Sequence, residues 1–472
     1  MKRQRTSPHR LEHDLLGEKK VPGDAYYGIQ TLRAMENFRI SGVPVSHYPE
    51  LIRALAMVKL AAARANHECG EIPRRVLGGI EKACREIIDG ALHEEFGVDV
   101  FQGGAGTSVN MCANEVIANR ALEHLGKKKG EYRYCDPHDH LNAAQSTNDA
   151  YPSALHLGMA LMNTRLVAEL RALEKSFRAK GREFRSVVKM GRTQLQDAVP
   201  MTLGQEFEAF ADSIENEVDV LERVESALLE VNMGGTAIGT GLNAPPAFAA
   251  KCVRQLSRIS GKKITLAKNL VEATQDTQPF VLYSSVLKSV AIKLSKICND
   301  LRLLASGPRA GLHEILLPAM QPGSSIMPGK VNPVIPEVMN QICFRIIGND
   351  LVVTLAAEAG QLQLNVMEPV IAHCIFEGQT LFMNGARTLR EFCVDGIRAD
   401  RDACKSFVER SIGIVTALNP VIGYERSTEL AEEAMKTGKG ILELVRERKV
   451  LTEAQIKKVL DPAAMTSSKV RE

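Results

Sequence analysis

Apolar residues recur every three or four positions along three long stretches in the middle of this chain. This spacing places apolar side chains along one face of an α-helix, close to the heptad spacing of helix bundles. The pattern therefore predicts three long amphipathic helices, each about 30 to 45 Å long. The apolar positions are Leu155, Met159, Met162, Leu166, Leu170, Leu173 and Phe177; Leu203, Phe207, Phe210, Ile214, Val218, Leu221, Val224, Leu228 and Val231; and Leu287, Val290, Leu294, Ile297, Leu301 and Leu304.

A further helix is expected from about Pro336 to Gly360, with shorter helical patterns over 50–70 and 110–126. We place Pro152 and Pro200 in the first turns of helices, where a proline is tolerated. Strand signals are sparse, and the alternating strands and helices of a Rossmann or barrel fold are not found in the pattern. The sequence therefore predicts a mainly α fold.

Long helices with apolar stripes need packing partners on more than one side. A single monomeric bundle could supply them, but we expect an oligomer that merges several bundles into one core. The pattern divides the chain into an N-terminal, mostly helical domain (1–147), a central long-helix bundle (148–402) and a small C-terminal helical domain (403–472). In the last of these, helical patterns are broken at Gly413, Pro420, Gly423 and Gly438.

Composition excludes several classes of protein. The 472 residues carry a net charge of +3 with both signs interspersed, which does not suggest a nucleic-acid or membrane surface. Val231–Ala250 has no charged residue but is too rich in Gly, Asn, Thr and Pro for a membrane helix. No apolar run follows the basic first ten residues, so we expect no secretory signal. The ten cysteines include no Cys-x-x-Cys pair, which indicates reduced thiols in a cytoplasmic protein.

Two polar loops precede helical patterns. Gly103–Asn110 contains three glycines, so its free backbone N–H groups could hold an anion at a helix start, or the loop could be a tight turn capped by Thr107 or Ser108. Gln145–Asp149 contains Ser, Thr, Asn and Asp in a row, which is more than a helix cap requires. Both interpretations stay open for each loop.

Two further loops lie deeper in the chain. Gly191–Pro200 joins two apolar-striped segments, either as a polar connection between helices or as part of a site. Gly323–Pro333 holds glycines, prolines, adjacent serines, a lysine and an asparagine, a set suited to holding a carboxylate and handling a proton. It is not a phosphate loop, because five residues separate Gly323 from Gly329 and Val331 follows Lys330.

Other site classes find little support. Asp136–His140 contains acids and histidines but lacks the His-x-x-x-His spacing of a catalytic zinc site, so a solvated loop is favoured over a metal site. No Gly-x-Ser-x-Gly elbow is present to anchor a hydrolase triad.

The loop Gly323–Pro333 resembles the signature loop of the aspartase/fumarase superfamily. The resemblance extends over nearly the whole chain, because Gly103–Asn110, Gln145–Asp149, Gly191–Met201 and Gly234–Asn243 follow in the family's order and spacing. Within the superfamily the chain is most similar to the aspartases. Fumarases typically have a sequence similar to Gly-Ser-Gly-Thr-Gln-Ser in the loop that corresponds to Gly103–Asn110. They have Ser-Ser-Asn-Asp in the loop that corresponds to Gln145–Asp149, and Pro-Thr-Gln-Cys-Glu at the end of the signature loop. The corresponding segments here are Gly-Ala-Gly-Thr-Ser, Ser146–Asp149 and Pro333–Glu337, and Ala359–Pro369 is also aspartase-like.

The resemblance implies a three-domain fold whose central bundle merges into a tetrameric helical core, with each active site built from three subunits. It implies reversible elimination of ammonia from L-aspartate to give fumarate through an aci-carboxylate. Ser324 is then the general base on a mobile loop. The substrate-binding residues are Thr107, Ser146, Thr147 and Ser325 for the β-carboxylate, Lys330, Asn332 and Thr193 for the α-carboxylate, and Asn148 with Gln194 for the amino group.

One position departs from much of the superfamily, which has His where this chain has Gln194. Glutamine cannot titrate, so any role of that histidine as a proton carrier does not transfer. No cofactor or metal ligand is implied as required, although some aspartases respond to a divalent cation such as Mg²⁺. Fumarate hydratase and a catalytically silent structural homotetramer are the alternative functions.

Overall fold

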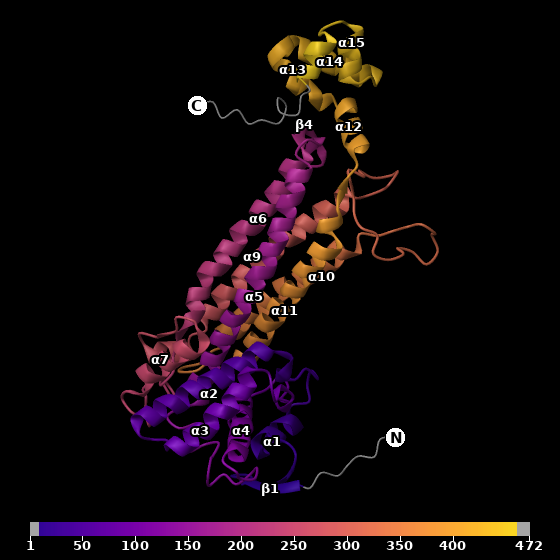
Figure 1. Cartoon of the computed structure of the whole chain (residues 1–472). Coiled ribbons are helices and arrows are strands. Elements are labelled where there is room, and N and C mark those ends of the chain that lie inside the picture. Colours follow the sequence, from indigo (N-terminus) through magenta and orange to yellow (C-terminus); the bar gives the residue numbers. More distant parts are fainter. Residues whose placement is uncertain (1–8, 460–472) are drawn as a thin grey trace. The chain divides into compact units, whose positions relative to one another are not determined.

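The computed structural model describes residues 9–459. Within these residues the protein is mainly α-helical, as predicted, and its strands are short (Figure 1). The helices are α1 (Ile29–Asn37), α2 (Pro49–Cys69), α3 (Arg74–Ile88), α4 (Thr107–His124), α5 (Thr147–Glu183), α6 (Leu203–Val224), α7 (Phe248–Ser260), α8 (Leu270–Gln275), α9 (Gln278–Leu304), α10 (Val334–Glu358), α11 (Glu368–Phe392), α12 (Arg401–Arg410), α13 (Val415–Ile422), α14 (Tyr424–Thr437), α15 (Ile441–Glu447) and α16 (Glu453–Val459).

The strands form two-stranded sheets, antiparallel except for the parallel pair β5–β6. Their bounds are β1 (His9–Asp14), β2 (Gly17–Pro22), β3 (Val188–Thr193), β4 (Gln196–Thr202), β5 (Glu230–Val231), β6 (Thr265–Leu266), β7 (Ile315–Leu316) and β8 (Arg398–Ala399). Short 3₁₀ turns are η1 (Val45–His47), η2 (His93–Glu95), η3 (Glu225–Leu229), η4 (Val394–Gly396) and η5 (Ile412–Ile414).

The chain divides into two compact units. The first comprises Met1–Val167, Asp219–Ser289 and Arg345–Leu381, and the second the remaining segments. Each of the long helices α5, α6, α9, α10 and α11 has one part in each unit. The two units are defined by contacts between residues and each combines separate segments of the chain. They therefore do not test the three domains predicted from the sequence, and the boundaries at 147/148 and 402/403 stay a prediction.

The predicted apolar stripes are buried. Every stripe position from Leu155 to Phe177, and from Leu287 to Leu304, lies in the core. The middle stripe is shorter than expected as a helix, because α6 ends at Val224 and its last two positions, Leu228 and Val231, belong to η3 and β5. Both are nevertheless buried, so the pattern identified the core correctly and the helix end wrongly.

Neither proline lies in the first turn of a helix. Pro200 belongs to β4, which pairs with β3 alone and is therefore an edge strand that tolerates a proline. Pro152 lies inside α5, beyond its first turn, and leaves the carbonyl of Asn148 without its helical N–H partner. The side-chain Nδ2 of Asn232 donates to that carbonyl at 2.9 Å and replaces the missing bond.

In the first unit, α2 packs against α3, α4 and α7. The start of α1 is tied to α4 by Glu115, whose carboxylate accepts hydrogen bonds from the backbone N–H groups of Gly28, Gln30 and Thr31. Burial raises the pKa of Glu115 to about 7, against the lowering effect of these bonds. The carboxylate therefore acts as a structural acceptor between two helices.

In the second unit, the β3–β4 hairpin packs against α12, and α12–α16 share a small apolar core that also contains Met190 of β3. Pro420 lies inside α13 and does not break it, contrary to the sequence pattern. Gly413, Gly423 and Gly438 do lie outside the α-helices. The predicted C-terminal segment, 403–472, thus contains most of α12 and all of α13–α16; its residues 460–472 lie outside the described part of the chain.

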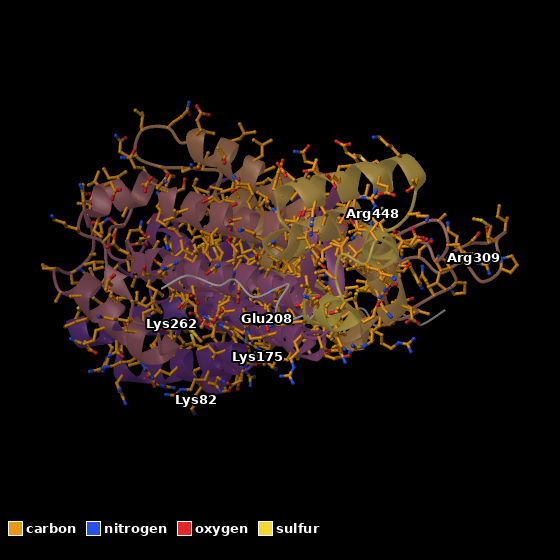
Figure 2. All side chains as sticks on the ribbon, turned by 90° about the horizontal axis from the view of Figure 1, so that it is seen from above. Lys82, Lys175, Glu208, Lys262, Arg309 and Arg448 are labelled. Carbon is orange, nitrogen blue, oxygen red and sulfur yellow. The ribbon has the colours of Figure 1, made fainter. Side chains whose placement is uncertain are left out.

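Charged side chains mark the outer faces of the helices. Figure 2 labels Lys82 on α3, Lys175 on α5, Glu208 on α6 and Arg309 after α9, all of them exposed. Within residues 9–459, none of the helices combines the length and the apolar character that a membrane crossing requires.

Candidate active site

In the first unit, the starts of two helices open onto one cavity of about 690 Å³. Thr107 is the first residue of α4, and Ser146 and Thr147 stand at the start of α5; all three line the cavity. A helix N-terminus carries free N–H groups and a partial positive charge, which favour an anion. The structure thus brings three of the sequence-predicted carboxylate-binding residues together.

The turn before α4 depends on glycine. Gly106 precedes the helix with φ at +84°, a left-handed conformation that L side chains rarely adopt. A Cβ at this position would lie 2.2 Å from the ring of Tyr151 on α5. Gly106 therefore allows the first turn of α4 to approach α5 closely.

The loop before α5 forms a capping box. The Asp149 carboxylate accepts a hydrogen bond from Ser146 N at 2.9 Å, and Ser146 Oγ accepts one from Asn148 N at 3.2 Å. The other Asp149 oxygen accepts from the N–H groups of Gly234 and Thr236, both at 3.0 Å. Burial raises the pKa of Asp149 to about 6, although these hydrogen bonds act to lower it. Capping thus accounts for Ser146 and Asp149 but not for Thr147.

Asn148 is used differently from its neighbours. Its Nδ2 donates to the backbone oxygen of Ala237 at 2.7 Å, and its own backbone oxygen accepts from Asn232. Ala237 lines the cavity but the side chain of Asn148 does not. In this structure the Asn148 amide is therefore engaged with the backbone of the 234–243 segment.

In the second unit, the loop Gly323–Pro333 is closed at its base. Gly323 N donates to Lys330 O at 2.7 Å, and Asn332 Nδ2 donates to Gly323 O at 2.8 Å. Ser324 is half-buried, whereas Ser325 and Lys330 are exposed. The loop thus gathers four of the predicted residues: Ser324, Ser325, Lys330 and Asn332.

Ser324 has a distinctive environment within that loop. Its Oγ accepts hydrogen bonds from the backbone N–H groups of Met327 at 2.9 Å and Ile326 at 3.2 Å. Two donors aimed at one hydroxyl oxygen stabilise negative charge on it. The arrangement suits a serine that must act as a base.

The third predicted loop is the tip of the β3–β4 hairpin rather than a connection between helices. Thr193 pairs with Gln196, leaving Gln194 and Leu195 as the two turn residues with φ of +53° and +63°. A two-residue turn with both φ values positive normally uses Gly or Asn, so this tip carries backbone strain. Thr193 and Gln194 are exposed there, and no hydrogen bond joins them to Gly323–Pro333 in the described part of the chain.

The base of the same hairpin holds a buried charge cluster that the sequence patterns did not indicate. Glu314, fully buried, pairs with Lys189 at 2.9 Å and with Arg192 at 2.8 Å. Burial alone would lower the pKa of Lys189, but the carboxylates of Glu206 and Glu314 raise it. The cluster anchors the strand from which the hairpin tip projects.

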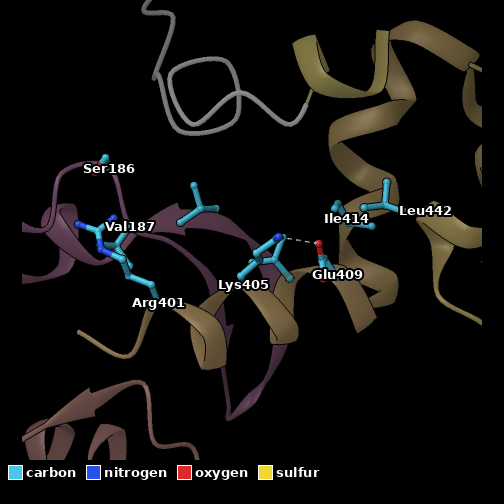
Figure 3. A pocket seen from close by; sticks show the side chains of 9 residues that line it. Ser186, Val187, Arg401, Lys405, Glu409, Ile414 and Leu442 are labelled. Atoms are coloured by element: carbon cyan, nitrogen blue, oxygen red, sulfur yellow. Dashed lines mark ion pairs between the residues drawn. The ribbon is translucent and has the colours of Figure 1, made fainter. Parts of the chain in front are cut away.

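Another cavity in the second unit, of about 290 Å³, contains none of the predicted site residues (Figure 3). Val187, Ile414 and Leu442 add apolar side chains to its lining, and Arg401 and Lys405 of α12 add positive charge. Lys405 also pairs with Glu409, one turn further along α12. Ser186 supplies the one hydroxyl among the residues that line this cavity, and none of those residues carries a side-chain amide.

The acidic and histidine-rich segment Asp136–His140 is folded on itself. Asp136 Oδ1 accepts from the N–H groups of His138 and Asp139, and His140 Nδ1 accepts from Asp136 N. Among residues 9–459, no group of three or more His, Cys, Asp or Glu side chains is arranged to hold a metal ion.

Comparisons with known proteins agree with this architecture. A family model described as "Lyase" matches residues 17–348, and one described as "Fumarase C C-terminus" matches residues 414–467. The chain is 59% identical to an aspartate ammonia-lyase from Pseudomonas aeruginosa, over 98% of each chain. It is 53% identical to the aspartate ammonia-lyase of Escherichia coli, over 95% of this chain and 94% of that one.

The chain belongs to the aspartase/fumarase superfamily. Solved structures support the same assignment. A cobalt-bound crystal structure titled fumarate lyase:delta crystallin, from Brucella melitensis, is 54% identical and superposes with a TM-score of 0.94, covering 98% of this chain and 100% of that one. A class II fumarase from Schistosoma mansoni is 34% identical with a TM-score of 0.88, covering 97% and 99%.

Several residues of this superfamily member were missed by sequence reasoning. Asn110 and Asn142 line the cavity and are joined by a side-chain hydrogen bond, and the fully buried Lys59 lies behind them and donates to Asn142. A lone lysine inside the apolar run Ala54–Ala63 was the available signal for Lys59, since an isolated charge in a buried helix usually has a specific partner.

Proposed function

We propose that this protein is an aspartate ammonia-lyase, a carbon–nitrogen lyase that reversibly eliminates ammonia from L-aspartate to give fumarate. The observation that carries the proposal is the 59% identity with a Pseudomonas aeruginosa aspartate ammonia-lyase across 98% of both chains. The cavity in the first unit and the serine loop in the second supply the groups that such a reaction needs.

The reaction requires a proton to leave the carbon next to the β-carboxylate. Ser324, as an alkoxide, takes that proton, and the electron pair moves into the carboxylate to form an aci-carboxylate. When the pair returns, the carbon–carbon double bond forms, the carbon–nitrogen bond breaks and ammonia leaves. The N–H groups of Ile326 and Met327 stabilise the alkoxide, because both donate to Ser324 Oγ.

The developing negative charge is the main energetic problem. We assign the β-carboxylate to Thr107, Ser146, Thr147 and Ser325, whose hydroxyl groups can donate to it. Preorganised donors of this kind contribute roughly 3–4 kcal/mol each to transition-state stabilisation. The support is that three of these residues line one cavity at two helix N-termini.

The remaining predicted site residues are assigned to the α-carboxylate and the amino group of the substrate. Lys330, Asn332 and Thr193 are assigned to the α-carboxylate, where a cation and two neutral donors complement its charge. Asn148 and Gln194 are assigned to the amino group. Gln194 can hydrogen-bond but cannot carry a proton, so it orients the amine only.

We propose a homotetramer whose active sites each take residues from three subunits. The support is an apolar face on α10, where Leu351 and Leu355 are both 61% exposed and Val352 is 38% exposed. Large apolar side chains at such spacing on one helix face indicate an interface between subunits. Size-exclusion chromatography with light scattering tests this assembly directly.

We further propose that the enzyme works in the cytoplasm and needs no cofactor, and that a divalent cation such as Mg²⁺ can activate it without being required. The ten cysteines are all unpaired, as expected in a reducing compartment. Turnover that survives dialysis against EDTA supports the absence of a required metal, and turnover that needs Mg²⁺ restored contradicts it.

The function is tested by following fumarate absorbance with purified protein and either L-aspartate or L-malate. A rise with L-aspartate alone, with one ammonia released for each fumarate, supports the proposal. A rise with L-malate alone would make the protein a fumarate hydratase. No change with either substrate would contradict both activities.

A further inference from the structure

Lys59 on α2 is a lysine with no access to solvent. An ammonium group in a protein interior costs several kcal/mol unless nearby groups compensate for it. No ion pair to a carboxylate is formed by Lys59 within residues 9–459; instead its Nζ donates to Gln145 Oε1 at 2.9 Å and Asn142 Oδ1 at 3.3 Å. The lysine is therefore held by two amide oxygens.

Both amides belong to the substrate cavity. Asn142 and Gln145 line the same cavity as Thr107, Ser146 and Thr147. Removal of Lys59 would therefore act on the cavity wall rather than on a distant part of the core.

Lys59 is one of several groups that hydrogen-bond to these amides and fix their orientation. Asn142 Oδ1 also accepts from Asn110 Nδ2 and Asn114 Nδ2, both at 3.1 Å, and Asn110 Nδ2 reaches Thr147 Oγ1 at 3.2 Å. Gln145 Nε2 donates to the backbone oxygens of Leu141 and Ala143, so its Oε1 is left to Lys59. The network runs from Lys59 through Asn142 and Asn110 to a predicted substrate-binding hydroxyl.

The surroundings of Lys59 leave its charge sensitive to a bound anion. Burial lowers the pKa of Lys59 to about 7, opposed by the charge of Asp149 on α5. The titratable groups facing it from α3 and α7 are the thiols of Cys84 and Cys252, whose pKa values are raised by burial, so both are neutral near pH 8. From α4 it meets only the uncharged amides of Asn110 and Asn114 by way of Asn142.

We propose that Lys59 is a positioning residue of the dicarboxylate cavity, which orients the Asn142 and Gln145 amides and supplies a positive charge behind them when a dicarboxylate is bound. This inference rests on the proposed function for the identity of the ligand. A dicarboxylate in the cavity stabilises the ammonium form, so binding near pH 8 draws a proton from solvent. At pH 6 the lysine is already charged and binding draws little.

The test is calorimetry of succinate binding in two buffers with different ionisation enthalpies at pH 8. Succinate has both carboxylates but no amino group to eliminate. The wild-type protein is expected to take up a proton when succinate binds. Lys59→Met is expected to lack this uptake, because methionine cannot be protonated. Other groups that titrate near pH 8 are common to both proteins, so the difference between them belongs to Lys59.

Two further variants separate positioning from charge. Lys59→Gln keeps N–H donors without a charge, so it should retain more kcat/KM than Lys59→Met while losing proton uptake as completely. Lys59→Met should lower kcat/KM by at least about tenfold, the size of a lost hydrogen bond to a charged group. Leu55→Met, a volume-conserving change elsewhere in the core face of α2, should change neither quantity.

Unchanged kcat/KM and proton uptake in a folded Lys59→Met would overturn the inference while leaving the proposed function intact. If succinate binds with proton uptake that depends on Lys59 but L-aspartate is not turned over, the inference is supported and the proposed reaction is contradicted. If neither lysine variant folds, the wild-type protein can still overturn the inference: the inference requires proton uptake at pH 8 that disappears at pH 6, and no uptake at pH 8 contradicts it.

Discussion

The side-chain amide of Asn232 donates a 2.9 Å hydrogen bond to the backbone oxygen of Asn148. In an uninterrupted helix that oxygen would accept from residue 152, but Pro152 has no N–H. Asn232 also donates to Thr274 Oγ1 at 3.0 Å and is almost fully buried. One side chain thus completes the start of α5, where the predicted substrate-binding residues lie.

Replacing Asn232 should therefore leave the Asn148 carbonyl of α5 without the hydrogen bond that Pro152 cannot supply. We expect Asn232→Leu to destabilise the protein by about 1–3 kcal/mol, because a partly buried carbonyl loses the donor that Asn232 supplies. Pro152→Ala restores a backbone N–H and should recover part of that loss in the double variant. Thermal unfolding of the four proteins measures the coupling, and strictly additive effects would show that Asn232 does not substitute for the missing bond.

Gly106 and Gly42 form a matched pair for the turn before α4. Both have positive φ, but a Cβ at Gly106 would lie 2.2 Å from Tyr151 whereas a Cβ at Gly42 would meet open space. Gly42→Ala should cost only the strain of the left-handed conformation, about 1–2 kcal/mol. Gly106→Ala should cost clearly more and reduce succinate affinity. Equal losses in the two melting temperatures would contradict the close approach of α4 and α5.

The buried Glu368, at the start of α11, predicts that the protein loses stability as the pH becomes alkaline. Burial raises the pKa of this carboxyl from its ordinary 4.5 to about 8. The folded state therefore holds the proton more tightly than the unfolded state, and stability present at low pH is lost as the pH rises through this window. Glu368→Gln cannot ionise, so its melting temperature should exceed that of the wild type at pH 9 and match it near pH 5. A difference that does not vary with pH would contradict this account.

Helix periodicity predicted most of the fold. The stripes at Leu155–Phe177 and Leu287–Leu304 are buried as expected, because a repeated apolar face has few alternatives to packing in a core. The prolines were misplaced because tolerance of Pro152 depends on Asn232, eighty residues away in the sequence. The β3–β4 hairpin was missed because its turn uses Gln194 and Leu195 instead of the glycine or asparagine that signals such a turn.

The candidate site was predictable where composition is unusual and unpredictable where partners are distant. Glycines beside hydroxyl residues mark the loops that contain Thr107 and Ser324, and a run of hydroxyl, amide and acidic residues marks the loop that contains Thr147. The N–H donors to Ser324 come from Ile326 and Met327 rather than from the loop's glycines, which composition alone does not distinguish. The Lys59 network draws on three separate segments, so only the fold could reveal it.

The most direct test of the account is the turnover of Ser324→Ala with L-aspartate, measured beside its affinity for succinate. We predict that turnover falls by about 10²–10⁴-fold, the usual contribution of a general base, while succinate affinity changes little. Ser285→Ala, a change at a partly exposed serine on α9, serves as the matched control and should behave like the wild type. Near-normal turnover by Ser324→Ala would contradict the assignment of Ser324 as the base.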